Sequence, residues 1–123
     1  MTEKYVSPSH WVYVPLSPKA AENDENDCTY KDSHETEFYS ELIMGKKSDF
    51  LFSIYRIFNQ KLDLLIDEFE EEKIPFEKLE PARRIAEFIM QQEGDEKKRG
   101  WAEHLVNIIQ KAIDCKTCVW IEG

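Results

Sequence analysis

The residues with the clearest chemical potential are two of the three cysteines of this 123-residue chain, which form a C-x-x-C pair at Cys115 and Cys118. In thioredoxin-like redox proteins such a pair follows a strand and opens a helix, whose N-terminus lowers the thiol pKa. Here the order is reversed, because a predicted helix precedes the pair and a predicted strand follows it. The negative end of the helix dipole would raise both pKa values. We therefore expect no redox catalysis at this pair.

A zinc site is the alternative use of these thiols, since structural zinc takes four cysteine or histidine ligands. The chain holds only one close pair of such residues, and the other candidates are scattered along it. The candidate ligands are Cys28, Cys115, Cys118 and one of His10, His34 and His104. None of the histidines lies in an H-E-x-x-H arrangement, so we expect neutral histidines at the surface or its boundary. We expect no metal and no other cofactor.

Two further patterns could support catalysis. Gly45-Lys46-Lys47-Ser48 matches the end of a phosphate-binding loop, but Ser40 stands where the upstream glycine is required. Carboxylates are abundant, but general acid–base catalysis needs one carboxyl in an apolar pocket that raises its pKa. Nearly all of the acidic residues fall on faces that are predicted to be polar. We therefore predict that the protein is not an enzyme.

The distribution of charge is the strongest signal in the sequence. The chain has 25 acidic and 16 basic residues, which give a formal net charge of −9. Residues 22–41 hold eight acids and one base, and residues 67–80 hold seven acids and two bases, whereas the rest of the chain is slightly basic. Such an uneven field repels nucleic acid and anionic membranes and attracts basic partners. We expect a basic protein partner and no direct binding to nucleic acid or membranes.

The N-terminal part of the chain predicts one strand followed by a loop. β-Branched and aromatic residues predict a strand, which Pro8 and Pro15 confine to His10–Val14, near the edge of a sheet. Residues 17–31 lack apolar periodicity and carry turn-forming residues. This composition predicts a long, acidic and mobile loop.

Four segments in which apolar residues recur every three or four positions predict helices. Their ranges are Asp32–Gly45, Asp49–Glu72, Pro81–Gln92 and Trp101–Asp114. A strand over Thr117–Ile121 pairs with the N-terminal strand, because a lone strand would leave its backbone groups unpaired. Thr29 and Tyr30 could supply a third strand. The sequence thus predicts a single α+β domain over residues 1–123, predominantly helical, with about four helices and a small sheet formed by the N- and C-terminal strands.

The longest predicted helix carries acidic residues three or four positions apart along one face. Like charges at this spacing destabilise a helix by roughly 0.2–0.5 kcal/mol per pair, and acids near its C-terminus oppose the dipole. A basic partner would offset both penalties, whereas a solvated face is the simpler interpretation. Together with the acidic loop, this face defines the predicted partner-binding residues. They are Asp63, Asp67, Glu70, Glu71, Glu22, Asp24, Glu25 and Asp27.

In these features the chain resembles bacterial toxin-immunity proteins, a class of small acidic proteins without catalytic motifs. The resemblance is carried by the acidic positions of the predicted helix, the acidic segment Glu22–Asp27 and the step from helix to strand over Ala112–Ile121. It implies that the protein binds and neutralises a cognate basic toxin domain, such as a nuclease delivered by contact-dependent growth inhibition. It assigns no role to any particular residue.

Two other functions stay open. An anti-restriction or anti-CRISPR protein would mimic the phosphates of nucleic acid, which requires carboxylates spread over an extended face. A small metal-binding or redox protein would use Cys115 and Cys118. The odd number of cysteines indicates a reducing compartment, and no apolar run is long enough to span a bilayer. We therefore expect a cytoplasmic protein, whose oligomeric state the sequence leaves open.

Overall fold

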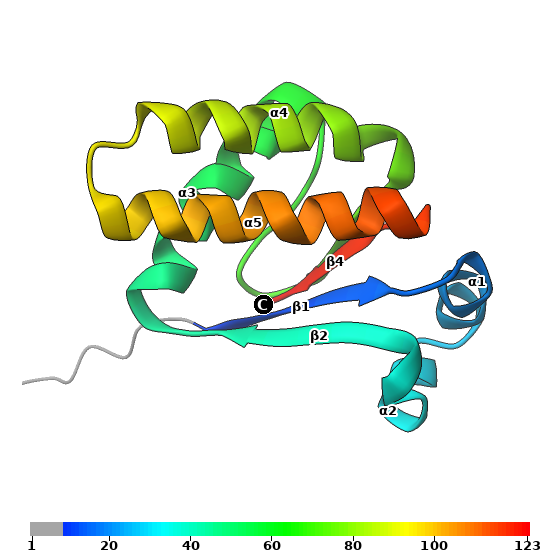
Figure 1. The fold of residues 1–123 in the computed structure, drawn as a ribbon. Helices are drawn as coiled ribbons and strands as arrows, with labels where there is room; N and C mark the ends of the chain where they lie inside the picture. The colour runs from blue at the N-terminus through cyan, green and yellow to red at the C-terminus, as the bar shows by residue number, and fades with distance from the viewer. Residues whose placement is uncertain (1–8) are drawn as a thin grey trace, which may run out of the picture.

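The computed structural model describes residues 9–123, and its central feature is a four-stranded antiparallel sheet in the order β2-β1-β4-β3. The strands are β1 (His10–Pro15), β2 (Phe38–Ile43), β3 (Glu71–Ile74) and β4 (Val119–Glu122). One face of the sheet is covered by three long helices (Figure 1), which are α3 (Gly45–Leu62), α4 (Phe76–Gln92) and α5 (Glu96–Cys115). At one end of the sheet lie α1 (Pro18–Asn26) and α2 (Tyr30–Ser33), and a short 3-10 helix η1 (Glu35–Glu37) leads into β2. The predicted α+β class, predominantly helical with a small sheet, is confirmed.

The N-terminal and C-terminal strands pair as predicted, with Val12 opposite Ile121 in an antiparallel ladder. The prediction that the first strand lies near a sheet edge is wrong, because β1 is flanked by β2 on one side and by β4 on the other. Pro15 is compatible with this interior place because it is the last residue of β1, where its missing N–H interrupts no pairing within the strand. Pro8 lies outside the described residues.

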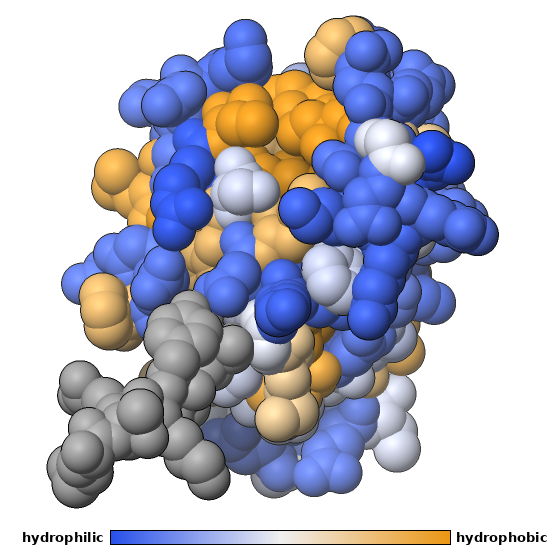
Figure 2. All heavy atoms as spheres, turned by 90° about the vertical axis from the view of Figure 1, so that its left-hand side faces the viewer, coloured by the Kyte–Doolittle hydropathy of each residue, from blue (hydrophilic) through white to orange (hydrophobic). Residues whose placement is uncertain are grey.

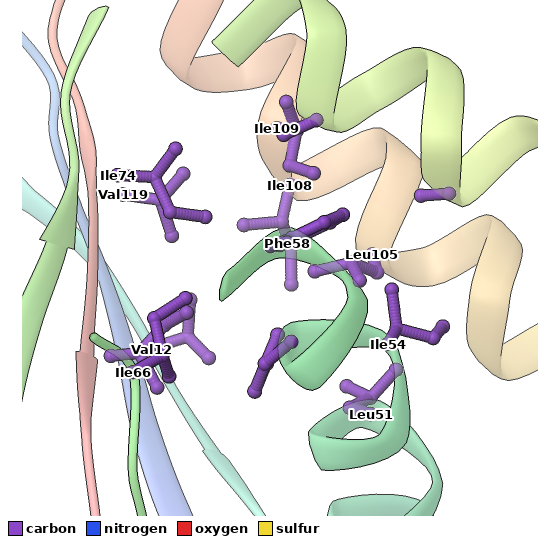
Figure 3. Packing of buried hydrophobic residues seen from close by; sticks show 14 of the residues in the cluster. Val12, Leu51, Ile54, Phe58, Ile66, Ile74, Leu105, Ile108, Ile109 and Val119 are labelled. Atoms are coloured by element: carbon purple, nitrogen blue, oxygen red, sulfur yellow. The ribbon is translucent and has the colours of Figure 1, made fainter. Parts of the chain in front are cut away.

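The hydrophobic core lies between the sheet and the three long helices. Figure 3 shows the side chains of Val12, Ile74 and Val119 pointing from the strands toward the helices. They face apolar side chains of α3 and α5, all buried, namely Leu51, Ile54, Phe58, Leu105, Ile108 and Ile109. Buried alanines occur on both α4 and α5, so the two helix backbones can approach closely along their length. The core therefore lies against one face of the sheet, and the side chains on the opposite face of the sheet do not point into it.

The helix predicted over Asp49–Glu72 is shorter at its C-terminal end than the apolar spacing suggested. It ends at Leu62, and Asp63 takes a left-handed conformation with φ 55°. The chain then passes through residues 63–70 as a loop, in which Leu64 and Ile66 are buried, before it enters β3. Buried and exposed residues alternate in this loop, so Leu64 and Ile66 contribute to the core without a helix.

Side-chain hydrogen bonds hold this loop against the helix that precedes it. The side chain of Asn59 on α3 donates to the carbonyl oxygen of Ile66 at 2.8 Å and accepts from its N–H at 2.9 Å. One amide thus satisfies both backbone groups of a residue that has no ladder partner. The loop therefore has a defined path, although it contains no helix or strand.

The acidic segment 17–31 is not a loop, because it forms α1 and the start of α2. Ser17 caps α1 by accepting a hydrogen bond from the N–H of Ala20 at 3.1 Å, and Pro18 occupies the first helical turn. Thr29 is the N-cap of α2 and Tyr30 is its first residue, so the predicted third strand there is wrong.

The helix predicted over Asp32–Gly45 is also wrong, since most of this range forms η1 and β2. The spacing of Phe38, Leu42 and Ile43 fits a helix, but pairing with β1 selects the strand. Gly45, which was expected to end a helix, has φ 64° and is the first residue of α3. Within residues 9–123, no helix is long and apolar enough to cross a bilayer.

Candidate functional site

The face of the sheet that points away from α3, α4 and α5 is the first candidate site, and we call it the open face. Side chains alternate along a strand, so the residues between the buried core positions of β1 and β4 must lie on this face. The strand register places Trp11 opposite Glu122 and Tyr13 opposite Trp120. The open face comprises Trp11, Tyr13, Ser40, Leu42, Glu71, Lys73, Trp120 and Glu122.

Aromatic and aliphatic side chains on the open face remain accessible to solvent. Trp11 and Leu42, which face each other across β1 and β2, are each 40% exposed. The rings of Trp11 and Tyr13 lie nearly parallel, with an angle of 14° between their planes and 5.9 Å between their centroids. Contiguous exposed apolar side chains rimmed by polar ones are typical of binding surfaces. The open face therefore offers contact area that the fold itself does not use.

A buried lysine joins the two acidic segments of the sequence at this face. Lys31 on α2 is only 8% exposed, and its ammonium lies 3.9 Å from Oδ1 of Asp24 on α1. The same ammonium lies 3.6 Å from Oε2 of Glu71 on β3 and 5.0 Å from the ring centroid of Tyr13. A second lysine, Lys73 on β3, is only partly buried and forms an ion pair with Glu25 on α1. Segments about 40 residues apart in the chain thus meet around two cations.

The carboxylates of this cluster are close enough to influence one another. Burial raises the pKa of Asp24, an effect that Lys31 opposes and that the charges of Glu25, Asp27 and Asp32 reinforce. Oδ1 of Asp24 is buried and accepts no hydrogen bond within the described residues. The neighbouring negative charges therefore make the ionised form of Asp24 less favourable in the free protein.

Two other groups on the open face respond to the same negative charge. Burial raises the pKa of Glu71, with Lys31 opposing the shift and Glu122 and Asp24 adding to it. Burial also raises the pKa of Tyr13 to about 12, and the charges of Glu122, Asp32 and Glu71 add to that shift. We call the carboxylates around the two lysines the acidic face. It comprises Asp24, Glu25, Asp27, Asp32, Glu35, Glu71 and Glu122.

Four of the eight predicted partner-binding residues belong to the acidic face, and these are Asp24, Glu25, Asp27 and Glu71. Glu22 lies next to them on α1, where its carboxylate is 3.9 Å from the ammonium of Lys19. The structure thus brings these predicted residues together on one surface, although the segment that carries most of them is helical and not a loop.

The predicted acidic stripe along the long helix does not exist as such. Asp63 follows the last residue of α3, and Asp67 lies in the loop, where its carboxylate accepts from the N–H groups of Phe69 at 2.7 Å and Glu70 at 3.0 Å. Glu70 precedes β3, and Glu71 begins it. The like-charge and dipole penalties expected on one helix therefore do not arise, and only Glu71 of this group reaches the acidic face.

Sequence reasoning missed several residues of this surface. They are Trp11, Tyr13, Lys31, Asp32, Glu35, Leu42, Trp120 and Glu122. The alternation in β1 and β4 could have identified the aromatic members, because two terminal strands that pair place their alternate residues side by side. No local signal identifies Lys31, since its role depends on contacts with α1 and β3.

The cysteines are not arranged as a reactive or metal-binding group. Cys118 is buried, and burial raises the pKa of its thiol to about 12, although the charge of Lys73 opposes the shift. Cys28 is exposed and Cys115 is partly buried. Among residues 9–123, no group of three or more histidine, cysteine, aspartate or glutamate side chains could hold a metal ion. At neutral pH the thiol of Cys118 is protonated and is a poor nucleophile.

One histidine lies in the core, contrary to the expectation of a surface or boundary position. His10 is 1% exposed, its Nδ1 lies 2.7 Å from Oγ of Ser48, and its Nε2 lies 2.9 Å from the hydroxyl of Tyr55. A serine beside a histidine can act as a nucleophile with its base. Ser48 and Tyr55 are both 0% exposed, however, so no substrate can reach this hydroxyl in the folded protein.

The helical side of the molecule presents a different kind of surface. Figure 2 shows apolar side chains gathered in the upper part of the face that it views, bordered by hydrophilic side chains on both sides. Partly buried apolar residues of α3 and α4 pack at the margin of the core, among them Phe50, Ile85, Ile89 and Met90. Phe50 lies 5.9 Å from Trp101 between ring centroids, and the charged side chains that line the pocket beside these two rings include three lysines, Lys46, Lys97 and Lys98. Positive charge therefore predominates beside these two rings, whereas carboxylates predominate beside the rings of the open face.

Comparison with known proteins gave no match of any kind, whether to a protein-family model, to a curated protein or to a solved structure. Function must therefore be inferred from the surface itself.

Proposed function

We propose that this protein binds a basic protein partner through the acidic face and the adjoining open face, and that it neutralises this partner as a toxin-immunity protein does. The observation that carries the proposal is the position of Lys31, which draws carboxylates of α1 and β3 together beside exposed aromatic rings. Seven carboxylates of the acidic face surround only two lysines, so the face keeps a strong negative potential. A basic partner is attracted to such a potential from a distance.

The open face supplies the short-range part of the same interaction. Binding energy at protein interfaces is concentrated in a few large residues, above all tryptophan, tyrosine and arginine. Trp11 and Tyr13 lie within the rim of carboxylates, and Trp11 is half-exposed. Charge complementarity mainly raises the association rate, whereas aromatic contacts mainly slow dissociation. The surface thus combines both requirements of a tight inhibitor.

The alternatives have less support from this geometry. A mimic of nucleic acid presents free carboxylates at the regular spacing of phosphates, but here Lys31 pairs with Asp24 and Glu71, and Lys73 pairs with Glu25. Catalysis by Cys118 or Ser48 would require an accessible nucleophile, and both side chains are buried. Binding of a basic protein is the function that uses the exposed features of the molecule.

The test begins with the basic protein that co-purifies from the native host, which is then produced separately so that its association rate can be measured by surface plasmon resonance. One variant removes three charges from the proposed surface, by Asp32→Asn, Glu35→Gln and Glu122→Gln. We expect association at low salt to slow by about tenfold and to lose most of its salt dependence. Stoichiometric addition of the unaltered protein should also abolish the activity of the partner.

A matched control removes the same number of charges from α5, at Glu96, Glu103 and Asp114, all of them exposed. These substitutions, to glutamine, glutamine and asparagine, should change the association rate by less than twofold. Equal effects of the two triple variants would show that only net charge matters, and the proposed surface would then be rejected. Binding that leaves the activity of the partner intact would reject neutralisation.

A further inference from the structure

A pocket with a volume of about 460 Å³ lies between the open face and α2. Its walls combine two aromatic rings of β1 with two carboxylates of the segment that leads into β2. The lining residues are Trp11, Tyr13, Lys31, Asp32, Glu35, Phe38 and Ser40. We propose that this pocket binds an arginine side chain of the basic partner. The proposal rests on the proposed function, because it names the group that the partner would insert.

The protein already holds one cation against this aromatic wall. The ammonium of Lys31 lies 5.0 Å from the centroid of the Tyr13 ring, within the distance at which a cation is attracted to an aromatic face. Asp24 and Glu71 neutralise this ammonium, at 3.9 Å and 3.6 Å. Lys31 therefore occupies the Tyr13 half of the wall without leaving net positive charge that would repel a second cation.

The Trp11 half of the wall is left for a group from outside. Its ring is stacked nearly parallel to that of Tyr13, with 5.9 Å between the ring centroids, and Trp11 is 40% exposed. Asp32 and Glu35 are exposed at the same pocket, and neither forms an ion pair with any other residue of 9–123. An accessible indole beside two unpaired carboxylates is the arrangement that a cation with an aromatic-stacking surface requires.

A guanidinium fits these features better than an ammonium does. It is planar, so it can stack on the indole of Trp11 while its edge donates hydrogen bonds to Asp32 or Glu35. An ammonium is a compact and strongly hydrated charge, which can approach the carboxylates but gains less from the ring. The carboxylates give the charge preference, and the indole gives the preference for arginine over lysine.

The experiment titrates the protein with N-acetyl-arginine amide and follows the indole N–H signals of the three tryptophans by nuclear magnetic resonance. We expect a saturable shift of the Trp11 signal at millimolar concentrations, a smaller shift of Trp120 and none of Trp101. N-acetyl-lysine amide should bind at least threefold more weakly, and the uncharged N-acetyl-citrulline amide at least tenfold more weakly. Asp32→Asn combined with Glu35→Gln should weaken the arginine response at least tenfold, since both side chains are exposed and the fold does not depend on them.

The matched control is Glu96→Gln combined with Glu103→Gln, two exposed positions on α5 that should leave the titration unchanged. An equal response to citrulline, a linear shift without saturation, or a response centred on Trp101 would each overturn the arginine site. The titration contains no partner protein. If it fails while the partner still binds the acidic face, only the pocket is rejected; if it succeeds while no partner binds, the proposed function is rejected instead.

Discussion

Acidification should destabilise this protein, because it would place a proton on a buried histidine. His10 is enclosed by Ser48 and Tyr55, whose hydroxyls contact its two ring nitrogens, and by the ring of Phe52, whose centroid is 4.8 Å away. In a neutral imidazole one nitrogen donates and the other accepts, so the two hydroxyls satisfy it without any charge. Burial lowers the pKa of His10 from 6.5 to about 4.

The magnitude follows from the difference between the folded and unfolded chains. The unfolded chain binds the proton with the ordinary pKa, so between pH 6.5 and pH 4 it holds more protons than the folded chain does. The contribution of the neutral ring to stability is therefore complete at pH 7 and is lost as the pH falls through this window. At about 1.4 kcal/mol per pKa unit, a pKa of about 4 for His10 corresponds to a loss of roughly 3 kcal/mol by pH 4.

Urea unfolding at pH 7, 6, 5 and 4 measures this loss when the protein is compared with its His10→Gln variant. Glutamine can donate and accept hydrogen bonds but does not titrate, and the carboxylates titrate alike in both proteins. We expect the unaltered protein to lose about 3 kcal/mol relative to the variant between pH 7 and pH 4. His34→Gln, at an exposed position, is the control and should leave the pH dependence unchanged. A difference between protein and variant that stays constant within about 0.5 kcal/mol would show that the core accepts a charged ring, and the reasoning would be wrong.

Three further predictions concern stability and reactivity. Asn59→Ala should lower the free energy of unfolding by about 2 kcal/mol, because two backbone groups of the loop before β3 lose their partner, and chemical denaturation checks this. Lys31→Met should cost about 3–5 kcal/mol by leaving Asp24 buried without a cation, and combining it with Asp24→Asn should restore most of that loss. In the native protein a disulfide reagent at pH 7 should modify the exposed Cys28 within minutes and Cys118 only after unfolding. The reason is that burial raises the pKa of the Cys118 thiol to about 12 and excludes the reagent. Modification of both thiols at equal rates would contradict this.

The parts of the fold that sequence could predict are those in which local spacing and tertiary packing agree. α5 and β4 satisfy both, because the buried positions of α5 recur at helical spacing and those of β4 alternate. β2 could not be predicted, since the spacing of Phe38, Leu42 and Ile43 suits a helix equally well and only pairing with β1 decides. α1 lacks an apolar stripe altogether, and its only local signals are Ser17 as a cap and Pro18 in the first turn.

The end of α3 shows how a correct pattern can lead to a wrong boundary. Leu62, Leu65, Ile66 and Phe69 continue the helical spacing of the residues before them. In the structure Ile66 is buried from an irregular segment, whereas Leu65 and Phe69 are 75% and 89% exposed. The helix ends just before Asp63, and aspartate is a residue type that tolerates the left-handed conformation. Aspartates also occur within helices, so this residue alone does not predict the end of α3. Only the competition between another helical turn and the pairing of β3 with β4 settles the boundary.

The wrong C-terminal boundary predicted for α3 matters less for the proposed function than for the fold. Electrostatic attraction depends on where charges lie on the surface, whereas direct contact depends on the positions of individual side chains. A field that acts over a Debye length of about 10 Å requires only that the carboxylates lie on one side of the molecule. The clustering of acids in two segments favours such an arrangement, and Lys31 brings one carboxylate of each segment together, Asp24 of α1 and Glu71 of β3. Contact depends on individual side chains, and here the strand register is decisive, because it places Trp11 and Tyr13 beside the carboxylates. The hypothesis of a basic partner therefore needs only the distribution of charge, whereas the choice of contact residues needs the strand register, which the sequence alone did not provide.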